Sequence, residues 1–146
     1  MSHLVSIKEV VFVDIDALKM TIEELQNNGV ACSLQQNVTA KSLFKAQRKK
    51  YDWVIKLDDS PFDVGLYMDK DKGGYVPKVD LMGDHVSYLL GIVPREGEDK
   101  NKCALAKLNR LYATHAAMRA AIKAGHTVQR INNRNGSIQL TVTMKD

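Results

Sequence analysis

The sequence predicts an α+β fold in a single domain spanning residues 1–146. Its length fits one domain of ordinary size. Apolar residues make up 45% and charged residues 26%, both near the average of globular proteins. Strand-like runs and two segments of helical periodicity follow in the order β-α-β-β-β-β-α-β-β. Consecutive hairpins in this order imply a largely antiparallel sheet with the two helices on one face.

The first strand is expected over residues 4–13, a run rich in β-branched side chains. A helix follows, because apolar residues recur at helical spacing. They are Ile15, Leu18, Ile22 and Leu25. Asp14 or Asp16 can cap this helix, since a carboxylate accepts hydrogen bonds from first-turn N–H groups. Gly29 is expected to end it.

The middle of the chain is expected to be mostly strands. Residues 30–38 and 51–57 are predicted strands, and residues 39–50 a short helix or an extended basic connection. Residues 61–68 and 75–81 flank the turn sequence DKDKGG, a pattern typical of a hairpin. Pro77 lacks an N–H, so its strand is expected to be an edge strand or to start late. Residues 85–93 are expected to form an apolar connection, and residues 95–101 a charged loop.

The strongest helix pattern covers residues 102–124 and ends before Gly125. Its expected apolar stripe consists of Leu105, Leu108, Tyr112, His115, Met118 and Ile122. The chain then runs through HTVQRI, NNRNGS and IQLTVTM. Because Asn135-Gly136 readily adopts turn conformations, these segments predict a C-terminal hairpin.

Composition also bears on location and redox state. Cys32 and Cys103 form no CxxC pair, which favours structural thiols in a reducing compartment. No window reaches the roughly 18 uninterrupted apolar residues of a membrane span. Lys8 and Glu9 lie where a signal peptide would need its apolar core. We therefore expect a cytoplasmic protein with no membrane contact.

Several short motifs along the chain occur together in one known family. They are the opening MSH, Ile7-Lys8, Asp16-Ala17-Leu18, Asp63-Val64-Gly65-Leu66, Tyr75, Asp80, Leu108, Tyr112-Ala113, Ala121, Gly125, Asn135-Gly136-Ser137-Ile138-Gln139-Leu140 and Val142. In these motifs the chain resembles the Ycf thirty-five family, named after a chloroplast hypothetical reading frame and also found in cyanobacteria, other bacteria and phages. The resemblance covers nearly the whole chain. This sequence departs from the family pattern at residues 41–50, at residues 95–101 and in the lack of an aromatic residue after Val142.

The resemblance implies a small α+β fold and no catalytic residue, because the family is a domain of unknown function. Its members often lie near genes for AAA-type ATPases. An accessory factor that contacts such a system is therefore an expectation from the resemblance alone. A phage source would fit a divergent, basic member of the family.

Three groups of residues could carry metal or acid–base chemistry. Asp69, Asp71, Gly74 and Asp80 fall on four places of a calcium-binding EF-hand loop. Gly73 removes the fifth ligand and the flanks are strands, so a solvated turn is expected instead. No histidine pair has the i, i+4 spacing of a zinc site.

The other two candidates are His115 and the carboxylates Asp58, Asp59 and Asp63. His115 lies on an apolar stripe, which favours a core or interface histidine. The carboxylates suit either acid–base work or a turn before Pro61. No nucleophile elbow, Walker loop or dinucleotide fingerprint is present, so no enzyme activity and no cofactor is expected.

Basic residues next to aromatic ones form the clearest candidate binding feature. The net charge is +4 and the pI is near 9.0. The candidate nucleic-acid or anion-binding residues are Lys41, Lys45, Arg48, Lys49 and Lys50, which precede Tyr51 and Trp53, with Arg130 and Arg134 as an extension. Cations can bind phosphates while aromatic rings stack on bases. The alternative is a solvated connection whose aromatic residues point into the core.

Three functions follow from these patterns. The leading expectation is a non-catalytic accessory or adaptor protein that binds another protein and can form a homodimer. The first alternative is a nucleic-acid-binding module that uses residues 41–50. The second is a protein that sequesters a small, nucleotide-like ligand.

Overall fold

The computed structural model describes residues 4–7, 10–42 and 49–144. Its elements in chain order are β1 (Leu4–Ser6), α1 (Ile15–Asn27), β2 (Cys32–Thr39), β3 (Lys50–Leu57), β4 (Val64–Asp69), β5 (Gly74–Asp80), the short 3-10 helix η2 (Met82–Asp84), α2 (His85–Leu90), α3 (Lys100–Ala104), α4 (Ala106–Lys123), β6 (Thr127–Asn132) and β7 (Ile138–Thr143). The α+β class is confirmed.

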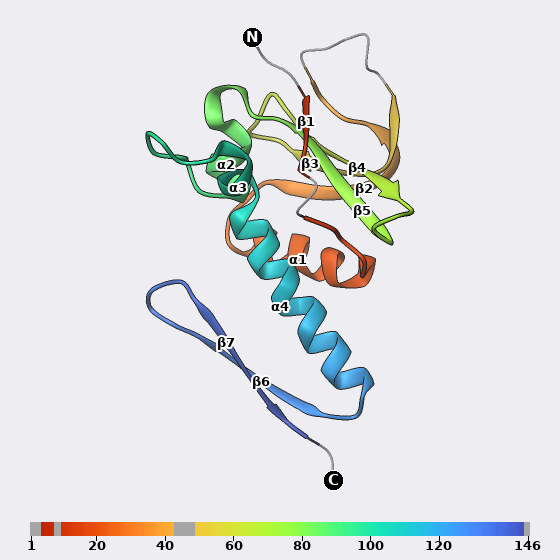
Figure 1. Cartoon of the computed structure of the whole chain (residues 1–146), viewed down its shortest axis with the longest axis vertical. Helices are drawn as coiled ribbons and strands as arrows, with labels where there is room; N and C mark the ends of the chain where they lie inside the picture. The colour runs from red at the N-terminus through yellow and green to blue at the C-terminus, as the bar shows by residue number, and fades with distance from the viewer. Residues whose placement is uncertain (1–3, 8–9, 43–48, 145–146) are drawn as a thin grey trace.

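The strands form two antiparallel sheets. The larger sheet has the strand order β1-β5-β4-β3-β2, and β6 and β7 form a separate two-stranded sheet. The expectation of one sheet was wrong, because the C-terminal hairpin contacts α4 and does not join the larger sheet. Figure 1 shows α4 leading from the larger sheet to this hairpin.

Helix α1 begins and ends where its sequence predicts. Asp14 is its N-cap, and its Oδ1 accepts a hydrogen bond from the N–H of Ala17 at 3.1 Å. Leu18, Ile22 and Leu25 are buried. The helix packs against α4, and together the two helices cover one face of the larger sheet (Figure 1).

The core lies between these helices and the sheet. Phe12 and Tyr112 meet edge to face, with 4.8 Å between ring centroids. The Tyr112 hydroxyl accepts hydrogen bonds from the N–H groups of Val13 and Asp14, each at 2.9 Å. These contacts fix the chain just before α1 against the middle of α4. Farther along α4, Ile122 is 60% exposed, so the expected apolar stripe ends before it.

The first strand is shorter than expected, and Pro77 supplies the reason. β1 ends at Ser6, although residues 4–13 were expected to form one strand. Pro77 lies in β5, which has β1 on one side and β4 on the other, so it is not on an edge strand. Its carbonyl accepts the N–H of Ile7 at 3.0 Å. Because Pro77 has no N–H to donate, the carbonyl of Ile7 accepts the N–H of Val10 instead, and the pairing with β5 is interrupted. It resumes only as a single bridge between Phe12 and Tyr75.

The helix expected over residues 102–124 is divided into α3 and α4 at Leu105, which has φ −122° and ψ 23°. The N–H of Ile92 donates to the carbonyl of Cys103 at 2.9 Å. A Cβ on Gly91 would lie 2.1 Å from that carbonyl oxygen. Because Gly91 has no Cβ, its segment can approach the helix closely. The carbonyl of Cys103 therefore accepts a hydrogen bond from Ile92, a residue distant in sequence. The segment over residues 85–93, expected to be an apolar connection, contains α2.

Candidate nucleic-acid interface

The candidate site lies on the face of the larger sheet opposite the helices. The strand register places Val54, Gly65, Lys78 and Ser6 in one row across four strands. Residues directly opposite in antiparallel strands share a face, and neighbours along a strand alternate. The buried side chains of Ile55, Val64 and Leu66 belong to the helix-covered face.

Gly65 makes room on this face for an aromatic ring. A Cβ at position 65 would lie 2.7 Å from atoms of the Tyr51 ring. The ring therefore rests on the backbone of β4, in a space that any larger residue would occupy. Burial raises the pKa of the Tyr51 hydroxyl, so it keeps its proton at neutral pH and stays a hydrogen-bond donor.

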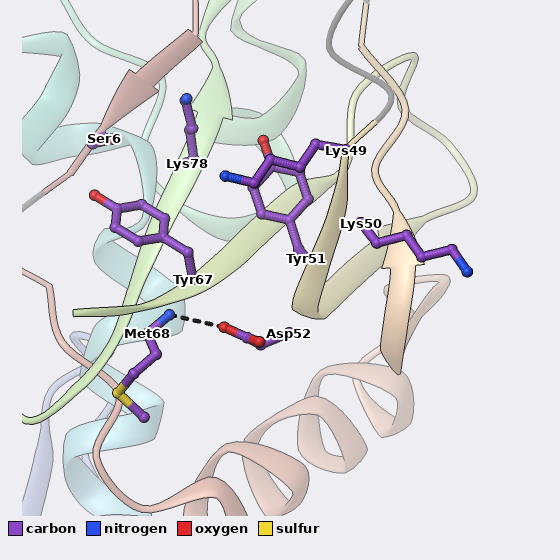
Figure 2. Close-up of a pocket in the computed structure, with 8 residues that line it drawn as sticks. All are labelled: Ser6, Lys49, Lys50, Tyr51, Asp52, Tyr67, Met68 and Lys78. Atoms are coloured by element: carbon purple, nitrogen blue, oxygen red, sulfur yellow. Dashed lines mark hydrogen bonds between the residues drawn. The ribbon is translucent and has the colours of Figure 1, made fainter. Parts of the chain in front are cut away.

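A pocket of about 430 Å³ opens beside this ring. It is lined by Ser6, Lys49, Lys50, Tyr51, Asp52, Tyr67, Met68 and Lys78. Figure 2 shows the side chains of Tyr51, Tyr67 and Lys78 gathered on the same side of the sheet, with Lys50 extending away from them. The volume lies in the usual range for small-ligand pockets, roughly 300–1,000 Å³.

The pocket carries more positive than negative charge. In the part of the chain that the structure describes, Lys49, Lys50 and Lys78 have no ion-pair partner. The single lining carboxylate, Asp52, accepts the N–H of Met68 at 3.0 Å. This bond holds β4 beside β3 beyond their last paired residues, Trp53 and Leu66. The ammonium groups of Lys49 and Lys78 beside two phenol rings, with Lys50 at the rim of the pocket, suit a ligand that carries both phosphate and an aromatic base.

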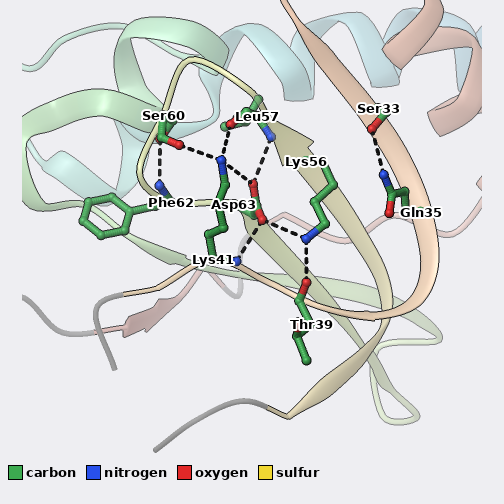
Figure 3. A network of polar contacts seen from close by, with 9 residues as sticks. All are labelled: Ser33, Gln35, Thr39, Lys41, Lys56, Leu57, Ser60, Phe62 and Asp63. Atoms are coloured by element: carbon green, nitrogen blue, oxygen red, sulfur yellow. Dashed lines mark hydrogen bonds and ion pairs between the residues drawn. The ribbon is translucent and has the colours of Figure 1, made fainter. Parts of the chain in front are cut away.

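Lys41 was expected to bind nucleic acid, but its ammonium group has internal partners. It donates to the carbonyls of Leu57 and Ser60 at 2.8 and 2.9 Å and lies 3.7 Å from Oδ1 of Asp63 (Figure 3). Asp63 is buried, and its Oδ2 lies 3.2 Å from the ammonium of Lys56. Lys41 therefore helps to fasten the end of β2 to the loop between β3 and β4.

The remaining predicted cations divide into three groups. Lys49 and Lys50 lie at the pocket, whereas Lys45 and Arg48 are outside the described residues. Arg130 donates to both carboxylate oxygens of Glu24, at 2.7 and 2.9 Å. Arg134 lies in the exposed turn of the C-terminal hairpin.

The two arginines do not extend the basic face as expected. Figure 1 shows the C-terminal hairpin at the opposite end of the molecule from the larger sheet, in which β3 begins at Lys50. Arg130 is in addition committed to its ion pair with Glu24 on α1. Of the seven predicted cations, only Lys49 and Lys50 are therefore placed by the described structure at one open site.

The calcium-loop pattern does not form a loop. Asp69 ends β4 and Asp80 ends β5, so β5 itself separates them. Asp69 instead accepts the N–H groups of Asp71 and Lys72 at 3.0 and 3.3 Å, as in a hairpin turn. No cluster of three or more potential metal-ligating side chains occurs among the described residues.

The histidine, carboxylate and cysteine candidates lie in places that do not form a common site. Nε2 of His115 lies 2.8 Å from Oε1 of Glu24, at the junction of α1, α4 and the hairpin. Asp58 and Asp59 are exposed, whereas Asp63 is buried among its lysine partners, so the three carboxylates do not share one environment. Cys32 and Cys103 are free thiols, and burial raises the pKa of Cys32.

Sequence reasoning missed Tyr67 and Lys78, which complete the pocket. The alternation within residues 61–68 and 75–81 could have assigned each of them to the face opposite Leu66 and Val79. It could not have placed them beside Tyr51, because that requires the pairing of β3, β4 and β5.

Comparisons with protein-family models, curated proteins and solved structures give no match for this chain. The resemblance to the Ycf thirty-five family, and the ATPase partner that it implies, therefore stay predictions. Among the described residues, no helix has both the length and the apolar character that crossing a membrane requires.

Proposed function

We propose that this protein binds single-stranded nucleic acid on the open face of its larger sheet. The observation that carries the proposal is the gathering of Tyr51, Tyr67 and the cations Lys49, Lys50 and Lys78 around one pocket. Tyr67 is half-buried and can offer part of its ring to a base. The lysines are placed to neutralise the phosphates on either side of that base.

The shape of the site favours a single strand over a duplex. An unpaired base can leave the strand and stack on a tyrosine, whereas the bases of a duplex are stacked on one another. Among the described residues, the open face presents a strand-built pocket and no helix that could enter a major groove. Because the site offers an aromatic ring as well as cations, it suits a nucleic acid better than a simple anion.

The proposal is tested by fluorescence anisotropy with short labelled oligonucleotides, measured over a series of salt concentrations. Three phosphate contacts predict that the logarithm of the association constant falls with the logarithm of salt with a slope of roughly −2. A duplex of the same sequence and free ATP serve as competitors. ATP that competes as well as the oligonucleotide would point to the small-ligand alternative.

Charge-matched variants separate the site from the net charge. Lys49→Glu with Lys50→Glu should weaken binding strongly, and Lys78→Glu should do so by itself. Lys100→Glu is the control, because Lys100 is an exposed cation at the start of α3 and does not line the pocket. Equal losses of affinity in Lys78→Glu and Lys100→Glu would contradict the proposal. An affinity that does not change with salt concentration would contradict it as well.

A second candidate function is the accessory role through protein–protein contact. Its support is a group of exposed apolar side chains around α2: Met82, Tyr88, Ile92 and Val93. The Tyr88 side chain is 77% exposed and lines a second pocket together with Asp59 and Asp84. Photo-crosslinking from position 88 in an extract of the source cell would test it. A single partner, lost on substituting Val93→Glu, would support it, and unselective crosslinks would not.

A further inference from the structure

The C-terminal hairpin presents strand edges that no other described strand covers. β6 and β7 pair only with each other, so each has one edge without a ladder partner in the described residues. An edge of this kind displays N–H and C=O groups that can pair with another strand.

The turn of the hairpin determines which residues of β7 face its open edge. The N–H of Asn133 donates to the carbonyl of Ser137 at 2.9 Å. Hydrogen-bonded pairs recur at every second position of an antiparallel ladder. The odd-numbered residues of β7 therefore direct their backbone groups at β6. Ile138, Leu140 and Val142 direct theirs outward.

β7 carries none of the features by which strands usually avoid pairing with other chains. Its sequence, IQLTVT, contains no charged residue, no proline and no glycine. It contains no residue with positive φ that would mark a bulge. Natural sheets protect exposed edges with charges, prolines or bulges. β6, by contrast, carries Arg130, whose guanidinium is held by Glu24.

Exposed apolar side chains lie at the end of the hairpin that is opposite its turn. Val142 is 41% exposed and Met144 is 66% exposed. Thr143 pairs with Thr127, which places the end of β7 beside the start of β6 and thus near the end of α4. Ile122, in the last turn of α4, is exposed as well. A partner strand along β7 would come close to this apolar corner.

We propose that β7 is a dimerisation edge, at which two copies of this chain pair their β7 strands antiparallel to form one four-stranded sheet. A second copy is the occupant that β7 fits best, because a twofold axis places the strand opposite itself. An uncharged strand meets no like-charge repulsion in that arrangement, whereas a charged one would. The site is independent of the proposed nucleic-acid face, which lies at the other end of the molecule (Figure 1).

The oligomeric state of the full chain tests the proposal, measured by sedimentation equilibrium over a wide concentration range. The wild type should form dimers. Val142→Pro should weaken the dimer by about 10- to 100-fold, because each dimer loses two outward N–H donors. The hairpin itself should persist, since this N–H does not pair with β6 and proline is tolerated at such edge positions. Val142→Ala is the matched control, because it shortens the side chain but keeps the N–H.

Hydrogen exchange gives a second reading that needs no variant. The amides of Leu140 and Val142 should exchange slowly at concentrations that favour the dimer and quickly at low concentration, while that of Thr141 stays protected throughout. A wild type that is monomeric at every concentration would overturn the proposal. A dimer that Val142→Pro leaves equally strong, with these amides unprotected, would overturn it as well. If Val142→Pro disrupts the hairpin, the exchange pattern of the wild type decides.

Discussion

Arg130 on β6 donates two hydrogen bonds, 2.7 and 2.9 Å long, to the carboxylate of Glu24 on α1, more than a hundred residues away in sequence. The same Glu24 carboxylate accepts a contact from Nε2 of His115 at 2.8 Å. Both charged side chains are largely shielded from solvent. This ion pair therefore ties the C-terminal hairpin to the helical layer, which the hairpin otherwise contacts through half-buried side chains.

Replacing Arg130 should loosen the hairpin. Arg130→Ala leaves a shielded carboxylate without its main partner, and we expect the free energy of unfolding to fall by about 1–3 kcal/mol. Denaturant unfolding measures this change. Arg134→Ala, in the exposed turn of the same hairpin, should change stability by less than about 0.5 kcal/mol. Equal effects of the two substitutions would show that the ion pair does not anchor the hairpin.

The same ion pair should make stability depend on pH in the acid range. The hydrogen bonds from Arg130 are the largest cause that lowers the pKa of Glu24 below its ordinary value of 4.5. A carboxylate with a depressed pKa stabilises the fold above its ordinary pKa and loses this contribution as the pH falls through the folded value. The wild type should therefore exceed Glu24→Gln in stability at neutral pH, and the difference should shrink below pH 4.5. A difference that stays constant with pH would exclude this role.

Gly65→Ala should displace the Tyr51 ring. The added methyl group would lie 2.7 Å from ring atoms, so either the ring or β4 must move. We expect a loss of about 1–3 kcal/mol of unfolding free energy, as for other overpacked sites. In a Tyr51→Leu background the cost of Gly65→Ala should be clearly smaller. Additive costs in this double-mutant cycle would mean that the two residues do not compete for the same space.

Asp63→Asn should destabilise the junction of β2, β3 and β4. The buried carboxylate accepts the N–H groups of Leu57 and Lys41 at 3.0 and 2.8 Å. An amide would turn its NH₂ group toward one of these donors and would leave two lysines without their counterion. We expect a loss of about 2–4 kcal/mol, measured by thermal or chemical unfolding. Asp59→Asn, at an exposed neighbouring position, is the control and should be nearly neutral.

Tyr67→Ala should weaken nucleic-acid binding without unfolding the protein. The half-buried ring lies at the edge of the pocket, where it can stack on a base. Loss of one stacked base costs about 1–3 kcal/mol, or roughly 5- to 150-fold in affinity. Tyr67→Phe keeps the ring and should bind nearly as well as the wild type. Affinity unchanged in Tyr67→Ala, measured by anisotropy at fixed salt, would remove the stacking contact from the proposed function.

Much of the fold could be predicted from local patterns. The spacing of Leu18, Ile22 and Leu25 indicates α1, and Asp14, one of the two expected caps, is its N-cap. The glycine-rich turn before β5 and Asn135-Gly136 predict the two hairpins that the structure contains. Such features depend on residues close in sequence, because helical periodicity, capping and tight turns are short-range interactions.

The site could be predicted only in part, for the same physical reason. Lys49 and Lys50 stand out as cations near aromatic residues, but the same pattern includes Lys41 and offers Arg130 as an extension. Those two bind carboxylates that lie far from them in sequence, Asp63 and Glu24. Whether a lysine or arginine meets solvent or an internal partner depends on which strands and helices become neighbours.

By itself, the sequence determined the class of the fold, the order of its main elements and the residues that cap and turn them. Tertiary structure alone decided that the long helix breaks at Leu105, close to where Gly91 packs against it, that Pro77 lies inside the sheet, and that Tyr67 and Lys78 join Tyr51 at one pocket. Local alternation assigns Tyr67 and Lys78 to their face of the sheet, but not Tyr51, which alternation from Ile55 would place on the opposite face. The pairing of distant strands and the competition for backbone carbonyls fix what each side chain meets.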